Sequence, residues 1–145
     1  MKGRVGVDEH SGLVHHVKST AASVGGVTIT HALLHGQEDS VFGDSRCNGA
    51  DISLNLSDCK ATFFIAAKRW KVKAISNVRE RKQVERWANC KASLRTKVEH
   101  PFRVIRRGFG YTKVRYRGLA KNTAQALTLF ALSNLWMVRR QLMPA

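Results

Sequence analysis

The chain has 145 residues, of which 43% are hydrophobic and 24% are charged, a composition that allows one domain with a core and leaves too little chain for two. Lys and Arg total 25 against 10 Asp and Glu, a net charge of +15, which favours a polyanionic partner such as DNA. The most apolar run, residues 126–138, falls short of the roughly 20 residues that a membrane helix needs. Three cysteines without a C-x-x-C pair indicate no zinc site and fit a reducing cytoplasm.

The charge is unevenly distributed along the sequence. Residues 1–59 hold four basic and seven acidic residues, a net −3, whereas residues 60–145 hold 21 basic and three acidic residues, a net +18. The basic back part predicts an anion-binding surface with a few carboxylates nearby. A membrane surface or an acidic protein would be attracted by the same charge.

The chain begins with a predicted β-hairpin. Residues 2–8 alternate in polarity as a strand does, and residues 13–19 form the returning strand. Between them, residues 9–12 predict a turn in which Gly12 is free to take a positive φ.

A helix and two short apolar strands are expected next. The helix covers residues 27–35, with Gly36 at its end. The strands cover residues 40–43 and 61–67, and the basic stretch 68–76 predicts a loop or a β-ribbon.

The back of the chain is predicted to be mainly helical. Residues 78–107 have a helical pattern, but Pro101 disfavours helical geometry at His100, so we expect a break there and two helical pieces. After an extended segment over 111–117, residues 119–141 form the clearest helix. Its apolar stripe consists of Leu127, Phe130, Ala131, Asn134, Leu135 and Val138. This order of strands and helices predicts an α/β fold, a mixed sheet with helices packed on it.

Two carboxylates stand out as candidates for a metal site. Asp44 directly follows a short strand, and the carboxyl ends of strands are where sites form in α/β sheets. Glu99 lies in a helical, strongly basic stretch. Carboxylates of this kind hold Mg²⁺ for phosphoryl transfer. The alternatives are that Asp44 is a turn residue and that Glu99 pairs with Arg95 or Arg103 on its own helix.

Basic residues recur every three to five positions along residues 79–107, with little opposing charge. This pattern favours phosphate binding over an ordinary solvated helix face. In residues 111–117, tyrosines alternate with Lys113, Arg115 and Arg117, which suits either stacking on bases or a half-buried strand.

Seven short segments are distinctive in their residue order. They are GVD (6–8), GLVH (12–15), HALLHG (31–36), VFGD (41–44), KVEHPFRVIRR (97–107), KVRYRGLAKN (113–122) and LFALSNLW (129–136). Together they closely resemble the DDE transposases of bacterial insertion sequences, of the insertion-sequence-five type, with an insertion-sequence-four-like transposase domain. The resemblance spans nearly the whole chain, and the stretch 97–136 is the most specific.

This resemblance implies an RNase H-like catalytic domain that cuts and joins DNA with two Mg²⁺ ions held by three carboxylates. Asp44 matches the second carboxylate, in its Gly-Asp motif, and Glu99 matches the third, with Arg95 before it and Arg106 after it. The first carboxylate lies upstream of the hairpin in the family and has no match here, because Asp8 matches the turn instead.

The sequence therefore predicts one partial transposase catalytic domain over residues 1–145, with a mainly helical basic part over 78–141. Its fold is expected to be an RNase H-like mixed sheet with flanking helices, incomplete because the first strand is missing. We expect a bacterial cytoplasmic protein, associated with the nucleoid, that binds double-stranded DNA at element ends and target, binds no membrane, and self-associates or pairs with an intact transposase. The expected DNA-contacting residues are Arg95, Lys97, Arg103, Arg106, Arg107, Lys113 and Arg115.

For lack of the first Asp, the chain is expected to be catalytically inactive. The alternative is a non-enzymatic basic DNA-binding protein, or a regulator of an intact transposase.

Overall fold

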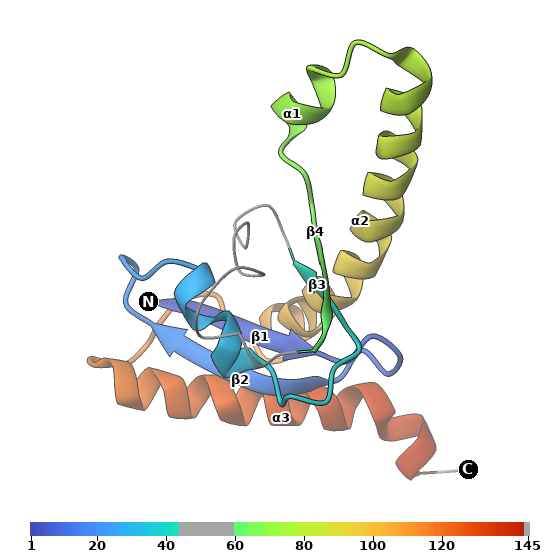
Figure 1. Cartoon of the computed structure of the whole chain (residues 1–145). Helices are drawn as coiled ribbons and strands as arrows, with labels where there is room; N and C mark the ends of the chain where they lie inside the picture. Colours follow the sequence, from blue (N-terminus) through green and yellow to red (C-terminus); the bar gives the residue numbers. More distant parts are fainter. Residues whose placement is uncertain (44–59, 144–145) are drawn as a thin grey trace. The chain divides into compact units, whose positions relative to one another are not determined.

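The computed structural model describes residues 1–43 and 60–143 (Figure 1). It divides into two compact units, of which the first combines Met1–Val24 with Lys97–Ala145 and the second consists of Gly25–Thr96. Helices in the described part of the chain all lack the combination of length and apolar content that a bilayer crossing requires.

In the first unit, β1 (Lys2–Val7) and β2 (Val14–Thr20) form the antiparallel hairpin that the alternating sequence predicts. The Asp8 amide donates to the Leu13 carbonyl, and the Gly12 amide donates to the Asp8 carbonyl, both at 2.9 Å. Gly12 has a φ of 72°, a conformation that glycine adopts without steric cost. The predicted turn is therefore confirmed.

The long helix α3 (Leu119–Leu142) packs on β2 (Figure 1). The Asn134 side chain joins the two elements, because its Oδ1 accepts from the Val14 amide at 2.9 Å and its Nδ2 donates to the Val14 carbonyl at 2.7 Å. Beside this pair, Phe130 packs with Val14 and Ile105 in the core of the unit. The helix predicted over 119–141 is confirmed.

The face that α3 buries matches the predicted stripe only in part. Phe130 is buried and Asn134 and Val138 are half-buried, whereas Leu127, Ala131 and Leu135 are exposed. Residues 122–138 of this helix include no charged side chain, so apolar periodicity alone could not select a face. The hydrogen bonds of Asn122 and Asn134 to neighbouring backbone fix which side is buried. The buried residues are Asn122, Ala126, Phe130 and Ser133.

Helix α2 (Val78–Arg107) runs without interruption through Pro101. The predicted break near His100, and the two helical pieces that it would create, are therefore wrong. Proline inside a helix removes one backbone hydrogen bond and costs about 3 kcal/mol. Here the Pro101 ring is fully buried, and Phe102 and Ile105 beside it pack in the core, so the burial of this face offsets that cost.

In the second unit, β3 (Ser40–Gly43) and β4 (Thr62–Ile65) pair in parallel. Phe42 lies opposite Phe64, and their rings stack with centroids 5.1 Å apart. Both strands confirm the predicted apolar strands. The predicted helix before them is present as the 3-10 helix η1 (Val27–Leu33).

The short helix α1 (Arg69–Lys73) occupies the basic stretch predicted to be a loop or a β-ribbon, so that prediction is wrong. The Ala74 amide donates to the Trp70 carbonyl at 3.1 Å, which closes the helix. Trp70 is 64% exposed, and an aromatic residue that is not half-buried gives no reason for an extended strand.

The described residues confirm a mixed α/β fold with small sheets and several helices. Over residues 1–43 and 60–143 there are two sheets of two strands each, one pair antiparallel and the other parallel. The RNase H-like arrangement, with all strands in one mixed sheet, stays a prediction. The stretch predicted as extended over 111–117 is irregular and forms no strand.

Candidate functional site

Glu99 lies on the exposed side of α2, in the part of the helix that belongs to the first unit. The opposite side of the same turns is buried. Pro101, Val104 and Ile105 are buried, and Phe102 packs in the core. Successive side chains point 100° apart around a helix. Burial of one side of α2 therefore fixes its rotation and leaves Glu99 facing solvent.

Two arginines share the exposed face with Glu99. Arg103 and Arg106, four and seven residues further along α2, lie close to its helical row, and both are exposed. Among the residues that the structure describes, neither forms an ion pair with Glu99. The alternative in which Glu99 is only the ion-pair partner of Arg103 therefore finds no support. The Arg95 side chain lies outside the described part of the structure.

Two further predicted DNA contacts take part in local structure. The Lys97 ammonium donates to the Glu9 carbonyl at 2.5 Å and so ties α2 to the turn of the hairpin. Arg115 is exposed and donates weakly to the Gly110 carbonyl, at 3.5 Å. Lys97 still has donors for a phosphate, because an ammonium group has three. Arg107 and Lys113 are exposed as well.

The irregular segment that carries Lys113 and Arg115 is held by Asn122, which sequence reasoning did not single out. The Asn122 Oδ1 accepts from the Tyr116 amide at 3.2 Å, and its Nδ2 donates to the carbonyls of Tyr116 and Gly118 at 2.6 Å. Asn122 is 3% exposed. A polar residue in the first turn of a predicted helix, after a glycine, was the available signal for such a role.

Asp44 lies outside the described residues, so its position relative to Glu99 is untested. The strand that precedes it is described. β3 ends at Gly43, and the Ala66 amide donates to the Gly43 carbonyl at 3.1 Å, next to the parallel partner strand. The motif thus follows the carboxyl end of a parallel strand, as the sequence predicts.

The Asp8 side chain forms hydrogen bonds within the turn of the hairpin. Its carboxylate accepts from the Ser11 amide and from the Ser11 hydroxyl, both at 2.6 Å. These two hydrogen bonds lower the pKa of Asp8 below its usual value. Asp8 is therefore a turn residue rather than a substitute for a missing catalytic carboxylate.

The described residues do not by themselves group three metal ligands. Glu99 fits the donor type that Mg²⁺ prefers, an exposed carboxylate, but it supplies one ligand only.

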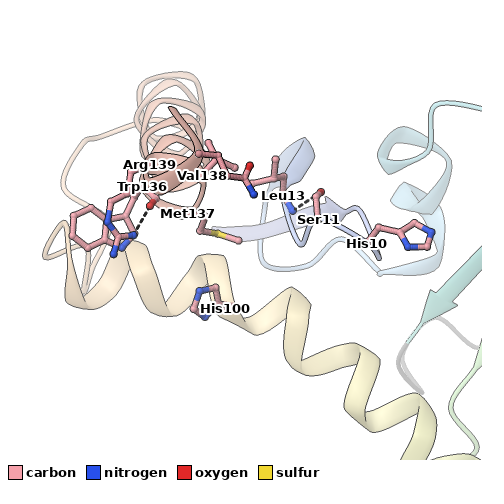
Figure 2. Close-up of a pocket in the computed structure, with 9 residues that line it drawn as sticks. His10, Ser11, Leu13, His100, Trp136, Met137, Val138 and Arg139 are labelled. Carbon is pink, nitrogen blue, oxygen red and sulfur yellow. Dashed lines mark hydrogen bonds between the residues drawn. The ribbon is translucent and has the colours of Figure 1, made fainter. Parts of the chain in front are cut away.

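A pocket of about 410 Å³ lies in the first unit, between the hairpin turn, α2 and α3 (Figure 2). His100, the neighbour of Glu99 in sequence, lines it from α2, and Trp136 and Arg139 line it from α3. The Arg139 guanidinium lies 3.9 Å from the centre of the Trp136 ring and donates to the Trp136 carbonyl at 2.6 Å. This pairing fills one side of the pocket with a cation and an aromatic ring of the chain itself.

These features define a mixed α/β protein with a basic helix that presents Glu99 to solvent beside two exposed arginines. The family model of the transposase DDE domain matches residues 1–135. The chain therefore belongs to the family of transposase DDE domains, which act on DNA and generally use a divalent metal. No solved structure matches the chain.

Proposed function

We propose that this chain is part of the catalytic domain of an insertion-sequence transposase, and that Glu99 and Asp44 are metal-binding residues of that domain. The observation that carries the proposal is the position of Glu99 on an exposed arginine face of α2, within a chain of the transposase DDE family. Such a face attracts DNA phosphates, and a carboxylate within it is placed to share a divalent cation with them.

In the intact enzyme, bound Mg²⁺ would polarise the phosphate and activate the attacking hydroxyl during cleavage and strand transfer. Glu99 and Asp44 would hold it. Arg95 and Arg106 flank the glutamate in sequence and would position the DNA backbone. Lys97, Arg103, Arg107, Lys113 and Arg115 would widen the contact.

We further propose that the chain alone does not cleave DNA. Of the three carboxylates that the family resemblance implies, this sequence matches two, and Asp8 is occupied by Ser11. Cleavage of a duplex that carries the element's terminal repeats, with Mg²⁺ present and abolished by Asp44→Ala, would overturn this part of the proposal.

The metal role of Glu99 is tested by DNA binding rather than by activity. In EDTA the glutamate repels phosphate, so Glu99→Gln should bind a labelled duplex several-fold more tightly than the unmodified chain. Addition of Mg²⁺ should strengthen binding by the unmodified chain and leave Glu99→Gln unchanged. The measurement is fluorescence anisotropy at fixed ionic strength.

Glu85→Gln is the matched control, because Glu85 is also an exposed glutamate of α2. It should retain the response to Mg²⁺. Equal responses of the two variants would mean that Mg²⁺ acts on the overall charge and not at Glu99.

A second candidate function is that of a non-enzymatic DNA binder, or of a regulator that pairs with an intact transposase. The net +18 of residues 60–145 favours it, since counterion release by cations requires no metal. A binder of this kind would hold DNA equally well in EDTA and in Mg²⁺, and Glu99→Gln would change its affinity by the same factor in both.

A further inference from the structure

Helix α3 carries a second apolar face, beside the one that packs on β2. Its large members are 48%, 56% and 61% exposed at Leu127, Leu135 and Leu142. Exposed alanines lie between them and Val138 is half-buried, so one seam runs along the helix for about 33 Å. The α3 seam consists of Ala120, Ala124, Leu127, Ala131, Leu135, Val138 and Leu142.

The seam has a two-fold pattern about Ala131. In an antiparallel pair of identical helices centred there, Ala131 meets its own copy, Leu127 faces Leu135, and Ala124 faces Val138. At the ends, a small residue faces a large one, Ala120 against Leu142. In a two-fold interface the same surface lies on both sides. Each residue must therefore fit the residue that the symmetry places opposite it.

The uncharged middle of α3 allows a second copy to approach on this face. The chain carries a net +15, so two copies repel each other over most of their surfaces. Residues 122–138 of α3 include no charged residue. An antiparallel pair also sets Lys121 opposite Gln141 and Arg139 opposite Thr123, whereas a parallel pair would oppose like charges at both positions.

We propose that two copies of this chain associate through the α3 seams, with the helices antiparallel and crossing at Ala131. Leu132, which is 40% exposed, lies beside the seam and extends the contact. Contiguous exposed apolar surface of this kind marks an interaction site in a water-soluble domain. The proposal is independent of catalysis and of the metal role of Glu99.

The first test is the oligomeric state of the full chain, measured by sedimentation velocity over a range of concentrations. The unmodified chain should form dimers, and Leu135→Glu should weaken dimerisation at least tenfold, since two glutamates would lie in an apolar contact. Val78→Glu is the matched control, because Val78 is 52% exposed and belongs to another helix. A chain that stays monomeric throughout, or equal dimerisation by all three proteins, would overturn the proposal.

The second test fixes the orientation and does not depend on how well Leu135→Glu folds. In a background in which Cys47, Cys59 and Cys90 are replaced by serine, Ala131→Cys should form an intermolecular disulfide under mild oxidation. Leu127→Cys and Leu135→Cys should each fail alone, but a mixture of the two proteins should cross-link. Efficient cross-linking of each single variant with itself would show a parallel pair and refute the antiparallel arrangement.

Discussion

Asn122 and Asn134 show how single buried polar side chains decide the packing of a helix. Each offers a carbonyl oxygen and an amide to the backbone of a neighbouring segment, Tyr116–Gly118 for Asn122 and Val14 for Asn134. A buried backbone amide without such a partner costs about 1–3 kcal/mol. These bonds therefore orient α3 more strictly than its apolar residues do.

Replacement of Asn134 by alanine should destabilise the chain by about 1–3 kcal/mol, because the buried amide and carbonyl of Val14 both lose their partner. Urea unfolding followed by circular dichroism measures the change. Thr128→Ala is the control, since the Thr128 hydroxyl is exposed and bonds only to its own helix at Ala124. Equal losses in the two variants would contradict the role of Asn134.

Acid should weaken the chain through two carboxylates of its turns. Hydrogen bonds from Ser11 lower the pKa of Asp8. Burial raises the pKa of Glu38, but hydrogen bonds from the His35 and Gly36 amides outweigh burial and lower it overall. A depressed folded-state pKa contributes stability that is present above the unfolded pKa and is lost as pH falls through the folded value.

The free energy of unfolding should therefore decline as pH falls below about 4, the unfolded range for carboxylates. The double variant Asp8→Asn, Glu38→Gln should show a shallower decline, because both titrations are removed. Urea titrations at a series of pH values between neutrality and the acid transition measure it. Identical pH profiles for the two proteins would refute the assignment.

At the scale of elements, the residues of α3 differ in burial and therefore in their contribution to stability. Phe130 is 3% exposed and contacts Phe102 edge to face, with ring centroids 5.1 Å apart. Phe130→Ala should cost about 3 kcal/mol or more, whereas Leu127→Ala should cost under about 1 kcal/mol, because Leu127 is 48% exposed. Thermal unfolding at concentrations too low for association checks both. A larger loss for Leu127→Ala would show that Leu127 packs in the core.

The exposed arginines of α2 should determine the salt dependence of DNA binding. If Arg103 and Arg106 each contact one phosphate, their replacement by glutamine should reduce the slope of log affinity against log salt by about 0.9 apiece. Lys18→Gln, at an exposed position of the hairpin, should leave the slope unchanged. Equal reductions for all three variants would indicate diffuse attraction rather than a defined contact surface.

At the scale of the whole molecule, the two units differ in the size of their cores. The first unit contains the cluster of Val14, Ile105 and Phe130, with six half-buried apolar residues around it. The hydrophobic residues buried in the described part of the second unit are Ile29 and Ala61. A two-stranded sheet with so small a core is marginally stable, so the second unit should open more readily than the first.

Amide hydrogen exchange should reflect this difference. The amides of β2 and α3 should exchange at least tenfold more slowly than those of β3 and β4, because opening the first unit exposes more apolar area. Mass spectrometry of peptides after timed exchange measures the rates. Slower exchange in β3 and β4 would mean that the second unit has the more stable core. Exposed sheet edges in either unit would add to the self-association expected from the sequence.

Local elements followed from local patterns. The hairpin, both short strands, η1 and α3 were predictable because alternation, turn residues and apolar periodicity act within a few residues. Predictions failed in four places. Core burial of Pro101 keeps α2 continuous, and α1 forms in the basic stretch expected to be a loop or a ribbon. The segment 111–117 forms no strand, and asparagine hydrogen bonds leave part of the predicted α3 stripe exposed. Of the candidate site, the exposure of Glu99 is described, and its relation to Asp44 stays a prediction.

The sequence alone determined the basic character of the chain, most of its elements and its membership in the transposase DDE family, because charge, periodicity and motif are properties of residue order. Only the tertiary structure decided which side of each helix meets the core. That choice depends on hydrogen bonds and packing between residues up to 120 positions apart, such as Val14 and Asn134. The packing of the two helices places Glu99 among arginines on the exposed side of α2 and leaves the uncharged α3 seam exposed.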